Sequence, residues 1–216
     1  MLVNLTNDKL HQSREVLPNS KAKELWLEMQ QGSKAAFELL FKCYYADLYD
    51  FGMKKIHSKE MVSDALQDLF IYIWQKKENL SEVKTVRSYL LTSLRNKLVN
   101  MIQNQKITLN KTDQWQKEQV SFALSSEDNQ IDFEHEQERK KLLHEAIQSV
   151  SEREREALYL KTYQDCSYRD ISQIMEISEQ VARNYVCGAL KKLRSYVNMQ
   201  SSHSNKQNIN KEKIGI

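Results

Sequence analysis

The scarcity of glycine and proline constrains the fold of this chain more than any other feature. Only four glycines and one proline occur among its 216 residues. The residues that replace them are mostly Leu, Lys, Glu, Gln and Ala, which are all favourable in helices. We therefore predict an all-α protein, and the length is sufficient for one large domain or two small ones with separate cores.

The composition and the pattern of the first residues limit the classes of protein to which this chain can belong. Hydrophobic residues make up 40% of the chain and charged residues 28%, and no apolar run approaches the roughly 20 residues of a membrane span. The first twelve residues lack the pattern of an export signal, so we expect a cytoplasmic protein without direct membrane insertion. Cys43, Cys166 and Cys187 are odd in number and far apart, which argues against a disulfide framework and a metal site.

Charge is distributed unevenly along the chain and suggests its domain organisation. Residues 21–107 carry fourteen basic and ten acidic side chains, and residues 139–196 carry eleven and eight. Between them, residues 108–138 carry two basic and eight acidic side chains and lack helical periodicity. We predict two helical domains joined by this acidic flexible linker. Residues 1–20 are expected to be a flexible extension and residues 197–216 a disordered polar tail.

Apolar residues at helical spacing define two helices of the first domain. One stripe runs from Phe37 to Phe51 and a second from Val62 to Ile73. The second helix also has a polar side that the apolar stripe does not use. This side is formed by Asp64, Gln67, Asp68, Ile71 and Gln75. We expect it to be free for a partner.

A third helix, about residues 86–102, carries the best basic surface of the first domain. Its leucines, from Leu90 to Leu98, are expected to pack inward. The side chains left for solvent or a ligand are Arg87, Arg95, Asn96, Lys97 and Asn100.

The second domain has the layout of a helix-turn-helix. Ser167 and Asp170 form a capping box for a short helix, Glu176 and Ile177 form the turn, and Ser178 caps the last helix. Arg183 can place two parallel N–H donors on a guanine edge, and Gln180 or Asn184 can donate to and accept from adenine. Lys191 and Lys192 carry charges that suit phosphates. Spacing alone is equally consistent with a helical hairpin that has a solvated polar face.

Taken together, the segments resemble a sigma-70 family RNA polymerase sigma factor of the extracytoplasmic-function (ECF) type. The first domain is similar to sigma region 2 through GSKAAFELLFKCYYADLYDFG, SDALQDLFIYIW and VRSYLLTSLRNKLVNMI. The second is similar to region 4 through SEREREALYLKTYQDCSYRDISQIMEISEQVARNYVCGALKKLR. The order of these pieces, with a linker between them, is the most specific part of the resemblance.

The resemblance implies core RNA polymerase as the main partner. Region 2 would dock on the clamp coiled coil of the largest subunit, and region 4 on the flap of the second-largest subunit. In region 2 the docking residues would be Asp64, Gln67, Asp68 and Ile71, with Phe70 and Trp74 holding their helix in place. An anti-sigma factor is a further partner found for many relatives.

Promoter DNA is the second partner that the resemblance implies. Region 2 would open the minus-10 element with Arg95, Asn96, Lys97 and Asn100. Tyr89 matches the same part of the family and is equally consistent with a core position. Region 4 would read the minus-35 element with Gln180, Arg183, Asn184 and Tyr185, and would contact the DNA backbone with Arg169 and Lys191.

Four positions depart from the family pattern. Asn100 stands where an aspartate is common, Gln103 and Gly188 where an arginine is common, and Val181 where a threonine often begins the recognition helix. The changes at Gln103, Gly188 and Val181 remove possible phosphate contacts, so the interpretation of region 4 rests mostly on Arg183 and Asn184.

Two other classes of function were weighed. His135-Glu136 begins like a metalloprotease motif, but Arg139 stands where the second histidine is needed. With no phosphate-binding loop or nucleophile motif elsewhere, we predict a protein that is not an enzyme and binds no cofactor. A stand-alone helix-turn-helix regulator with a helical sensor domain is the alternative, and it would bind duplex DNA without the polymerase.

Overall fold

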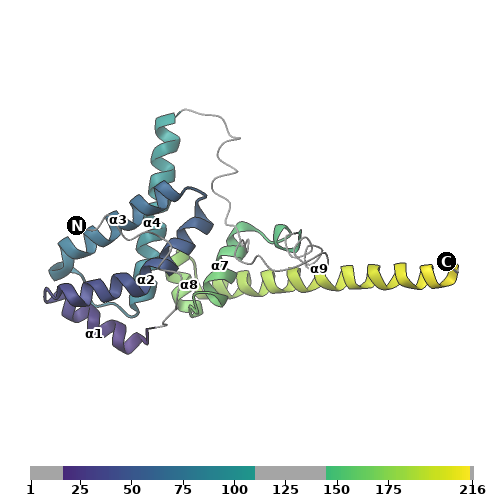
Figure 1. The fold of residues 1–216 in the computed structure, drawn as a ribbon, viewed down its shortest axis with the longest axis horizontal. Coiled ribbons are helices and arrows are strands. Elements are labelled where there is room, and N and C mark those ends of the chain that lie inside the picture. Colours follow the sequence, from purple (N-terminus) through teal and green to yellow (C-terminus); the bar gives the residue numbers. More distant parts are fainter. Residues whose placement is uncertain (1–16, 110–144, 215–216) are drawn as a thin grey trace. The chain divides into compact units, whose positions relative to one another are not determined.

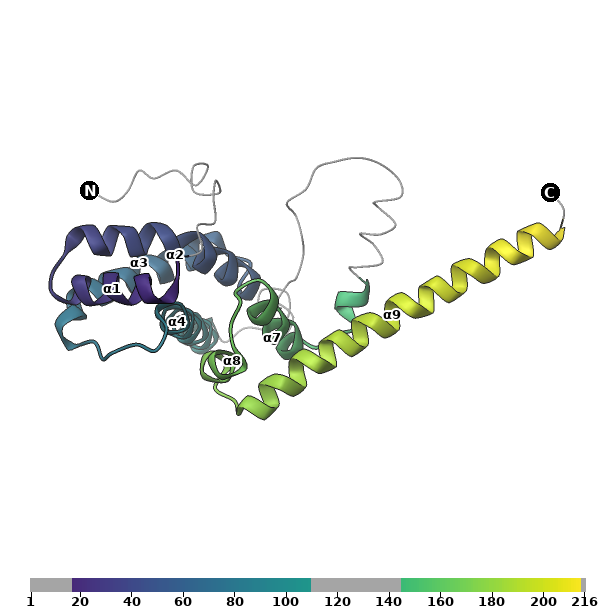
Figure 2. The same cartoon turned by 90° about the horizontal axis from the view of Figure 1, so that it is seen from below.

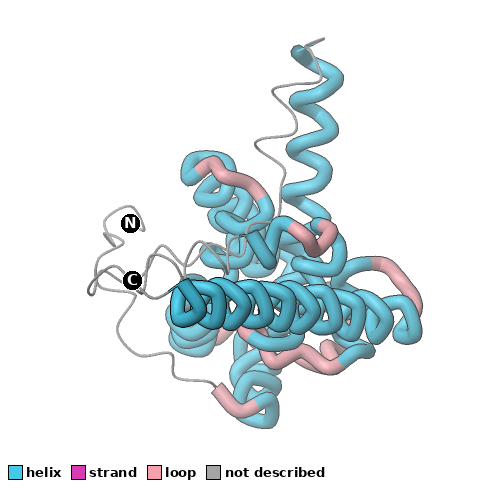
Figure 3. The backbone as a smooth tube through the Cα atoms, turned by 90° about the vertical axis from the view of Figure 1, so that its right-hand side faces the viewer, coloured by secondary structure: helices cyan, strands magenta, loops and turns pink. Residues whose placement is uncertain are grey.

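A computed structural model describes residues 17–109 and 145–214 of the chain. Within these residues every regular element is a helix, as Figure 3 shows in cyan with short loops in pink between them. The prediction of an all-α fold is therefore confirmed. The N-terminal extension up to residue 16 and the acidic linker from residue 110 onward lie outside the described residues.

The first compact unit contains the helices α1 (Asn19–Gln30), α2 (Lys34–Lys55), α3 (Lys59–Lys76) and α4 (Val86–Leu109). A short 3-10 turn, η2 (Lys77–Asn79), follows α3. Helices α2 and α4 each contact the other three helices of this unit, so the four helices share one core (Figures 1 and 2). Leu40, Leu48 and Phe51 of α2 are almost fully buried, in agreement with the predicted apolar stripe.

Glycine and serine residues define the helix ends of the first unit. Gly32 ends α1 with φ +98°, a backbone conformation that favours glycine. The Ser33 and Ser58 hydroxyls then accept hydrogen bonds from the amides of Ala36 (3.2 Å) and Met61 (3.3 Å) and cap α2 and α3. Gly52 lets α2 approach α3 closely, because a Cβ there would lie 2.7 Å from a methyl carbon of Val62.

The second compact unit contains α7 (Glu152–Thr162), the start of α8 (Tyr168–Met175) and α9 (Glu179–Ile214). Helices α7 and α9 pack against each other, and their cores include Ala157, Leu160, Ala182 and Ala189, all fully buried. Small alanines on both helices allow this close packing. The unit therefore has a compact apolar centre although α7 and α8 are short.

The turn between α8 and α9 has the expected place and a well-defined geometry. Glu176 adopts a left-handed conformation with φ 56°. Its amide donates to the Gln173 carbonyl (3.4 Å), and the Ile177 amide donates to the Ser172 carbonyl (3.0 Å). This is a Schellman ending, which satisfies the last carbonyls of α8. The Ser178 hydroxyl then caps α9 by accepting from the Val181 amide at 3.2 Å.

Helix α9 is longer than the sequence analysis predicted. Residues 197–216 were expected to form a disordered tail, whereas α9 continues to Ile214. The segment 197–214 contains no glycine or proline, so nothing interrupts the backbone hydrogen-bond ladder that the apolar part of α9 begins. Among the described residues no helix is both long and apolar enough to cross a membrane.

Candidate nucleic-acid and polymerase interfaces

The first turns of α9 present a polar face to solvent. Gln180, Arg183 and Asn184 are exposed, whereas Ala182 and Val186 of the opposite face are almost fully buried. The spacing of apolar residues along α9 allows either Tyr185 or Val186 to point inward. The structure assigns that position to Val186, and Tyr185 is half-buried. The polar side chains that suit base edges therefore share one accessible surface.

Two contacts organise the side chains of this face. The guanidinium carbon of Arg183 lies 4.4 Å from the centroid of the Tyr168 ring, a cation–π contact. The Gln180 amide group donates a hydrogen bond to the Asn184 side-chain oxygen at 3.0 Å. That bond uses one N–H of Gln180 and one lone pair of the Asn184 oxygen, so the Gln180 oxygen and the Asn184 amide NH2 group remain for a base.

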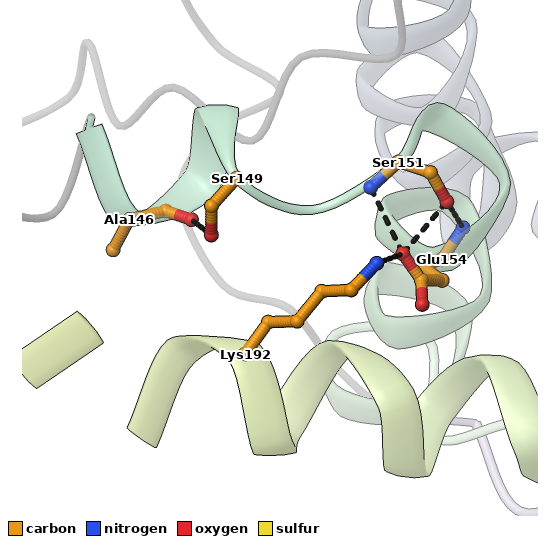
Figure 4. A network of polar contacts seen from close by, with 5 residues as sticks. All are labelled: Ala146, Ser149, Ser151, Glu154 and Lys192. Carbon is orange, nitrogen blue, oxygen red and sulfur yellow. Dashed lines mark hydrogen bonds and ion pairs between the residues drawn. The ribbon is translucent and has the colours of Figure 1, made fainter. Parts of the chain in front are cut away.

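The basic residues near this face differ in their availability. Arg169 and Lys191 are exposed. Lys192, which the sequence analysis also assigned to phosphates, instead forms an ion pair with Glu154 at 2.7 Å (Figure 4). Its charge is used within the second unit, so Arg169 and Lys191 are the better candidates for phosphate contacts.

Glu154 is the centre of the polar network drawn in Figure 4. Its carboxylate accepts hydrogen bonds from the Ser151 amide (2.9 Å) and hydroxyl (2.7 Å), while the Glu154 amide donates to the Ser151 hydroxyl, which completes a capping box for α7. Partial burial acts to raise the pKa of Glu154, but the hydrogen bonds from Lys192 and Ser151 outweigh it and lower the pKa below its ordinary value.

Gly188 explains how Glu154 reaches α9. A Cβ at position 188 would lie 2.7 Å from the Glu154 Oε1 atom. Only glycine leaves this space free without moving the carboxylate. Gly188 is one of the positions that depart from the family pattern, and here the missing side chain makes room for the capping carboxylate.

The polar face of α3 is as accessible as the sequence predicted. Asp64, Gln67 and Asp68 are exposed, and the Ile71 side chain is 42% exposed. Tyr72, which the sequence analysis did not select, is 52% exposed on the same helix. Its position next to Ile71 is the signal that could have identified it, because exposed tyrosines are enriched in protein interfaces.

Aromatic packing on the opposite side holds α3 in place. Phe70 makes edge contacts with Phe37 and Phe41 of α2, at ring-centroid distances of 6.1 and 4.8 Å. Trp74 also contacts Phe37 at 5.1 Å. These rings fix the rotation of α3 about its axis, so its polar face stays directed away from the core.

The basic surface of α4 is smaller than expected, because Arg95 is only 6% exposed. The prediction of a solvent-facing Arg95 is wrong. The reason is its spacing: residue 95 lies four positions after Leu91 and three before Leu98, so it falls on the same face as these core leucines. Its long aliphatic stem can pack there while the charged end finds a partner.

The other selected residues of α4 are accessible to different degrees. Asn100 is exposed, whereas Asn96 and Lys97 are half-buried. Lys97 forms an ion pair with Asp68 of α3 at 3.0 Å, which links the two selected surfaces. Tyr89 is half-buried and packs edge-on against Trp26 at 5.1 Å, so it belongs largely to the core, and burial raises its pKa.

Comparison with known proteins connects these surfaces to a family. The model of sigma-70 region 2 matches residues 40–107, and that of sigma-70 region 4 matches residues 140–193. The two models together cover more than half of the chain. The chain is also 23% identical over 159 residues to the ECF RNA polymerase sigma factor SigM of Bacillus subtilis (strain 168). This alignment covers 74% of the chain and 93% of SigM.

Two solved structures share the fold. One is CnrH in complex with the cytosolic domain of CnrY, with 14% identity, a TM-score of 0.55, and coverage of 82% of this chain and 97% of CnrH. The other is the sigma factor RpoE in complex with the anti-sigma factor NepR from Bartonella quintana, with 19% identity, a TM-score of 0.55, and coverage of 75% and 96%. A helical region 2 followed by a helical region 4 defines a sigma factor, a protein of promoter-specific transcription. This chain belongs to the sigma-70 family and is of the ECF type.

Proposed function

We propose that the two units divide promoter recognition and polymerase binding between named surfaces. Residues 139–196 act as region 4 and read the minus-35 element, with Gln180, Arg183 and Asn184 toward base edges. Arg169 and Lys191 contact the DNA backbone, and Tyr185 lies at the margin of the contact. The exposure of the three polar side chains on one face of α9 is the observation that carries this proposal.

Residues 21–107 act as region 2 in the same proposal. The face of Asp64, Gln67, Asp68 and Ile71 docks on the clamp coiled coil of the polymerase, and Asn96, Lys97 and Asn100 contact the opened minus-10 element. Support comes from the exposure of the α3 face and from the aromatic contacts that orient it. Buried Arg95 takes no direct part in DNA binding and supports α4 from inside the unit.

Three further aspects of the proposal rest on the family relationship. Region 4 docks on the flap of the second-largest polymerase subunit, and residues 108–138 serve as the connection between the two regions. The protein works in the cytoplasm as a non-enzymatic initiation factor. An anti-sigma factor holds it inactive under some conditions, in keeping with the complex of RpoE with the anti-sigma factor NepR.

The placement of the recognition helix is tested by replacing Arg183 with alanine. Arg183→Ala should lower the preference for one or two bases of the minus-35 element by about 1–3 kcal/mol, the value of a lost bidentate contact to guanine. The measurement is run-off transcription with core polymerase on a promoter found among genomic fragments and on single-base variants of it.

Arg194→Ala is the matched control, since Arg194 is exposed on the same helix eleven residues further on. It should leave base preference unchanged. If Arg183→Ala also left base preference unchanged, α9 would not read the minus-35 element in the proposed way.

A further inference from the structure

Tyr168 is the first residue of α8, and nothing in the sequence analysis selected it. Its ring lies beneath the guanidinium group of Arg183, with 4.4 Å between the guanidinium carbon and the ring centroid. Tyr168 is half-buried, whereas Arg183 is exposed. A largely fixed ring therefore supports a side chain that otherwise has many accessible rotamers.

The backbone position of Tyr168 at the start of α8 is well determined. Ser167 and Asp170 form a capping box around it: the Ser167 amide donates to the Asp170 carboxylate at 3.0 Å, and the Asp170 amide donates to the Ser167 hydroxyl at 3.1 Å. The Lys161 ammonium lies 5.5 Å from the ring centroid and donates to the Cys166 carbonyl at 3.1 Å. These contacts fix the start of α8, from which the ring reaches Arg183.

We propose that Tyr168 is a positioning residue for base recognition by Arg183. This inference rests on the proposed role of Arg183 in reading the minus-35 element. The N–H donors of a guanidinium group lie in its plane, so stacking on a ring restricts the rotamer and leaves the donors free for a guanine edge. Tyr168 thus reduces the conformational entropy that Arg183 loses when it binds a base.

If the ring restricts the rotamers of Arg183, removal of the ring should weaken base discrimination without changing phosphate contacts. Loss of an exposed cation–π contact corresponds to about a two- to fivefold effect. Tyr168→Leu should therefore lower discrimination at the base read by Arg183 by about two- to fivefold. The salt dependence of DNA binding should not change, because the number of cations that meet phosphates is the same.

The experiment uses the full chain with core polymerase, in run-off transcription from a promoter and its single-base minus-35 variants. Tyr168→Phe keeps the ring and should retain the discrimination of the original protein. Tyr168→Leu and Tyr168→Met remove the ring and should each lower this discrimination by about two- to fivefold. In the Arg183→Ala background, Tyr168→Leu should have no further effect on base preference.

Tyr163→Leu is the matched control, because Tyr163 is also a tyrosine of the second unit and is 59% exposed. It stacks on Tyr159 at 5.3 Å and should leave base preference unchanged. Two aliphatic replacements of Tyr168 are used so that a folding defect in one of them, detected by circular dichroism, does not decide the outcome.

The outcomes separate this inference from the proposed function. If Arg183→Ala itself left base preference unchanged, the proposed function would fail. If Arg183→Ala relaxed the preference but Tyr168→Leu and Tyr168→Met did not, the positioning role would be overturned and Arg183 would still be a reading residue. A defect of Tyr168→Phe equal to that of Tyr168→Leu would also overturn it, because the hydroxyl group would then be the active part.

Discussion

Glu154 shows how one side chain can serve two helices. It caps α7 through Ser151 and pairs with Lys192 of α9, and its side chain is only 12% exposed. We predict that Glu154→Gln lowers the free energy of unfolding at pH 7 by about 1 kcal/mol, since it weakens a helix cap and removes an ion pair. Urea unfolding followed by circular dichroism measures this change.

The pH dependence of that effect has a definite sign. The pKa of Glu154 in the folded protein is lower than its ordinary value of 4.5, mainly through hydrogen bonds from Lys192 and Ser151 that outweigh partial burial. The stabilisation is therefore fully present above about pH 4.5 and is lost as the pH falls through the lower pKa of the folded state. The difference between the original protein and Glu154→Gln should shrink below pH 4.5, and a constant difference would contradict the assignment.

The sequence predicted solvent exposure correctly for polar residues beside a clear apolar stripe, but not for the arginine side chain at position 95. Asp64 and Asp68 are exposed as expected. Arg95 was misplaced because charge was weighed above its helical register, and an arginine stem can pack among leucines. The contact between Arg183 and Tyr168 spans fifteen positions and depends on the turn angle, which spacing along one helix cannot reveal.

At the scale of elements, the contact between α7 and α9 depends on Gly188. Replacement of a glycine in a helix interior by alanine usually stabilises a protein by about 1 kcal/mol. Here the added Cβ would lie 2.7 Å from the Glu154 Oε1 atom, and the other oxygen of this carboxylate, Oε2, is held by Ser151 and Lys192. We predict that Gly188→Ala gains much less than the usual amount, and that the full gain returns in the Glu154→Ala background.

A double-mutant cycle checks this coupling between α7 and α9. The free energies of unfolding of the two single variants and the double variant are measured by urea unfolding at pH 7. Hydrogen exchange of the α7 and α9 amides assigns the changes to the second unit. Additive effects would show that Glu154 moves away from position 188 without cost.

Helix boundaries that carry a capping signal were predictable, and one without such a signal was not. Ser167 and Ser178 each cap the helix that the sequence assigned to them. The end of α9 was placed too early because a polar composition was taken to indicate disorder. A polar helix has no apolar face to pack against a core, but polar residues do not break the backbone hydrogen-bond ladder. The segment 197–214 contains no glycine or proline that would break it.

At the scale of the whole molecule, family membership was predictable because it depends on the order of several weak motifs rather than on any one contact. The two matched regions, residues 40–107 and 140–193, follow one another as the sequence analysis expected. That order does not show which region binds the polymerase and which reads the promoter. A test of these roles requires variants that impair one surface and leave the other unchanged.

Asp68→Arg is a variant that should impair polymerase binding and leave promoter reading unchanged. The change places a positive charge on the exposed α3 face and breaks the 3.0 Å ion pair with Lys97. We expect affinity for core polymerase to fall by at least about tenfold, since a reversed charge at an interface costs several kcal/mol. The change also frees Lys97, which is itself one of the proposed minus-10 contacts, so weaker attraction to DNA cannot account for a loss of transcription.

Glu38→Arg on α2 is the matched control. It makes the same change of charge at an exposed position and breaks a comparable surface pair, between Glu38 and Lys42 at 3.9 Å. Competition for labelled core polymerase, measured by fluorescence anisotropy, should show a loss of affinity for Asp68→Arg and none for Glu38→Arg. The residual transcription of Asp68→Arg at high protein concentration should keep the original minus-35 preference, because Arg183 is untouched. Equal losses in the two variants would mean that net charge, rather than the α3 face, governs binding to the polymerase.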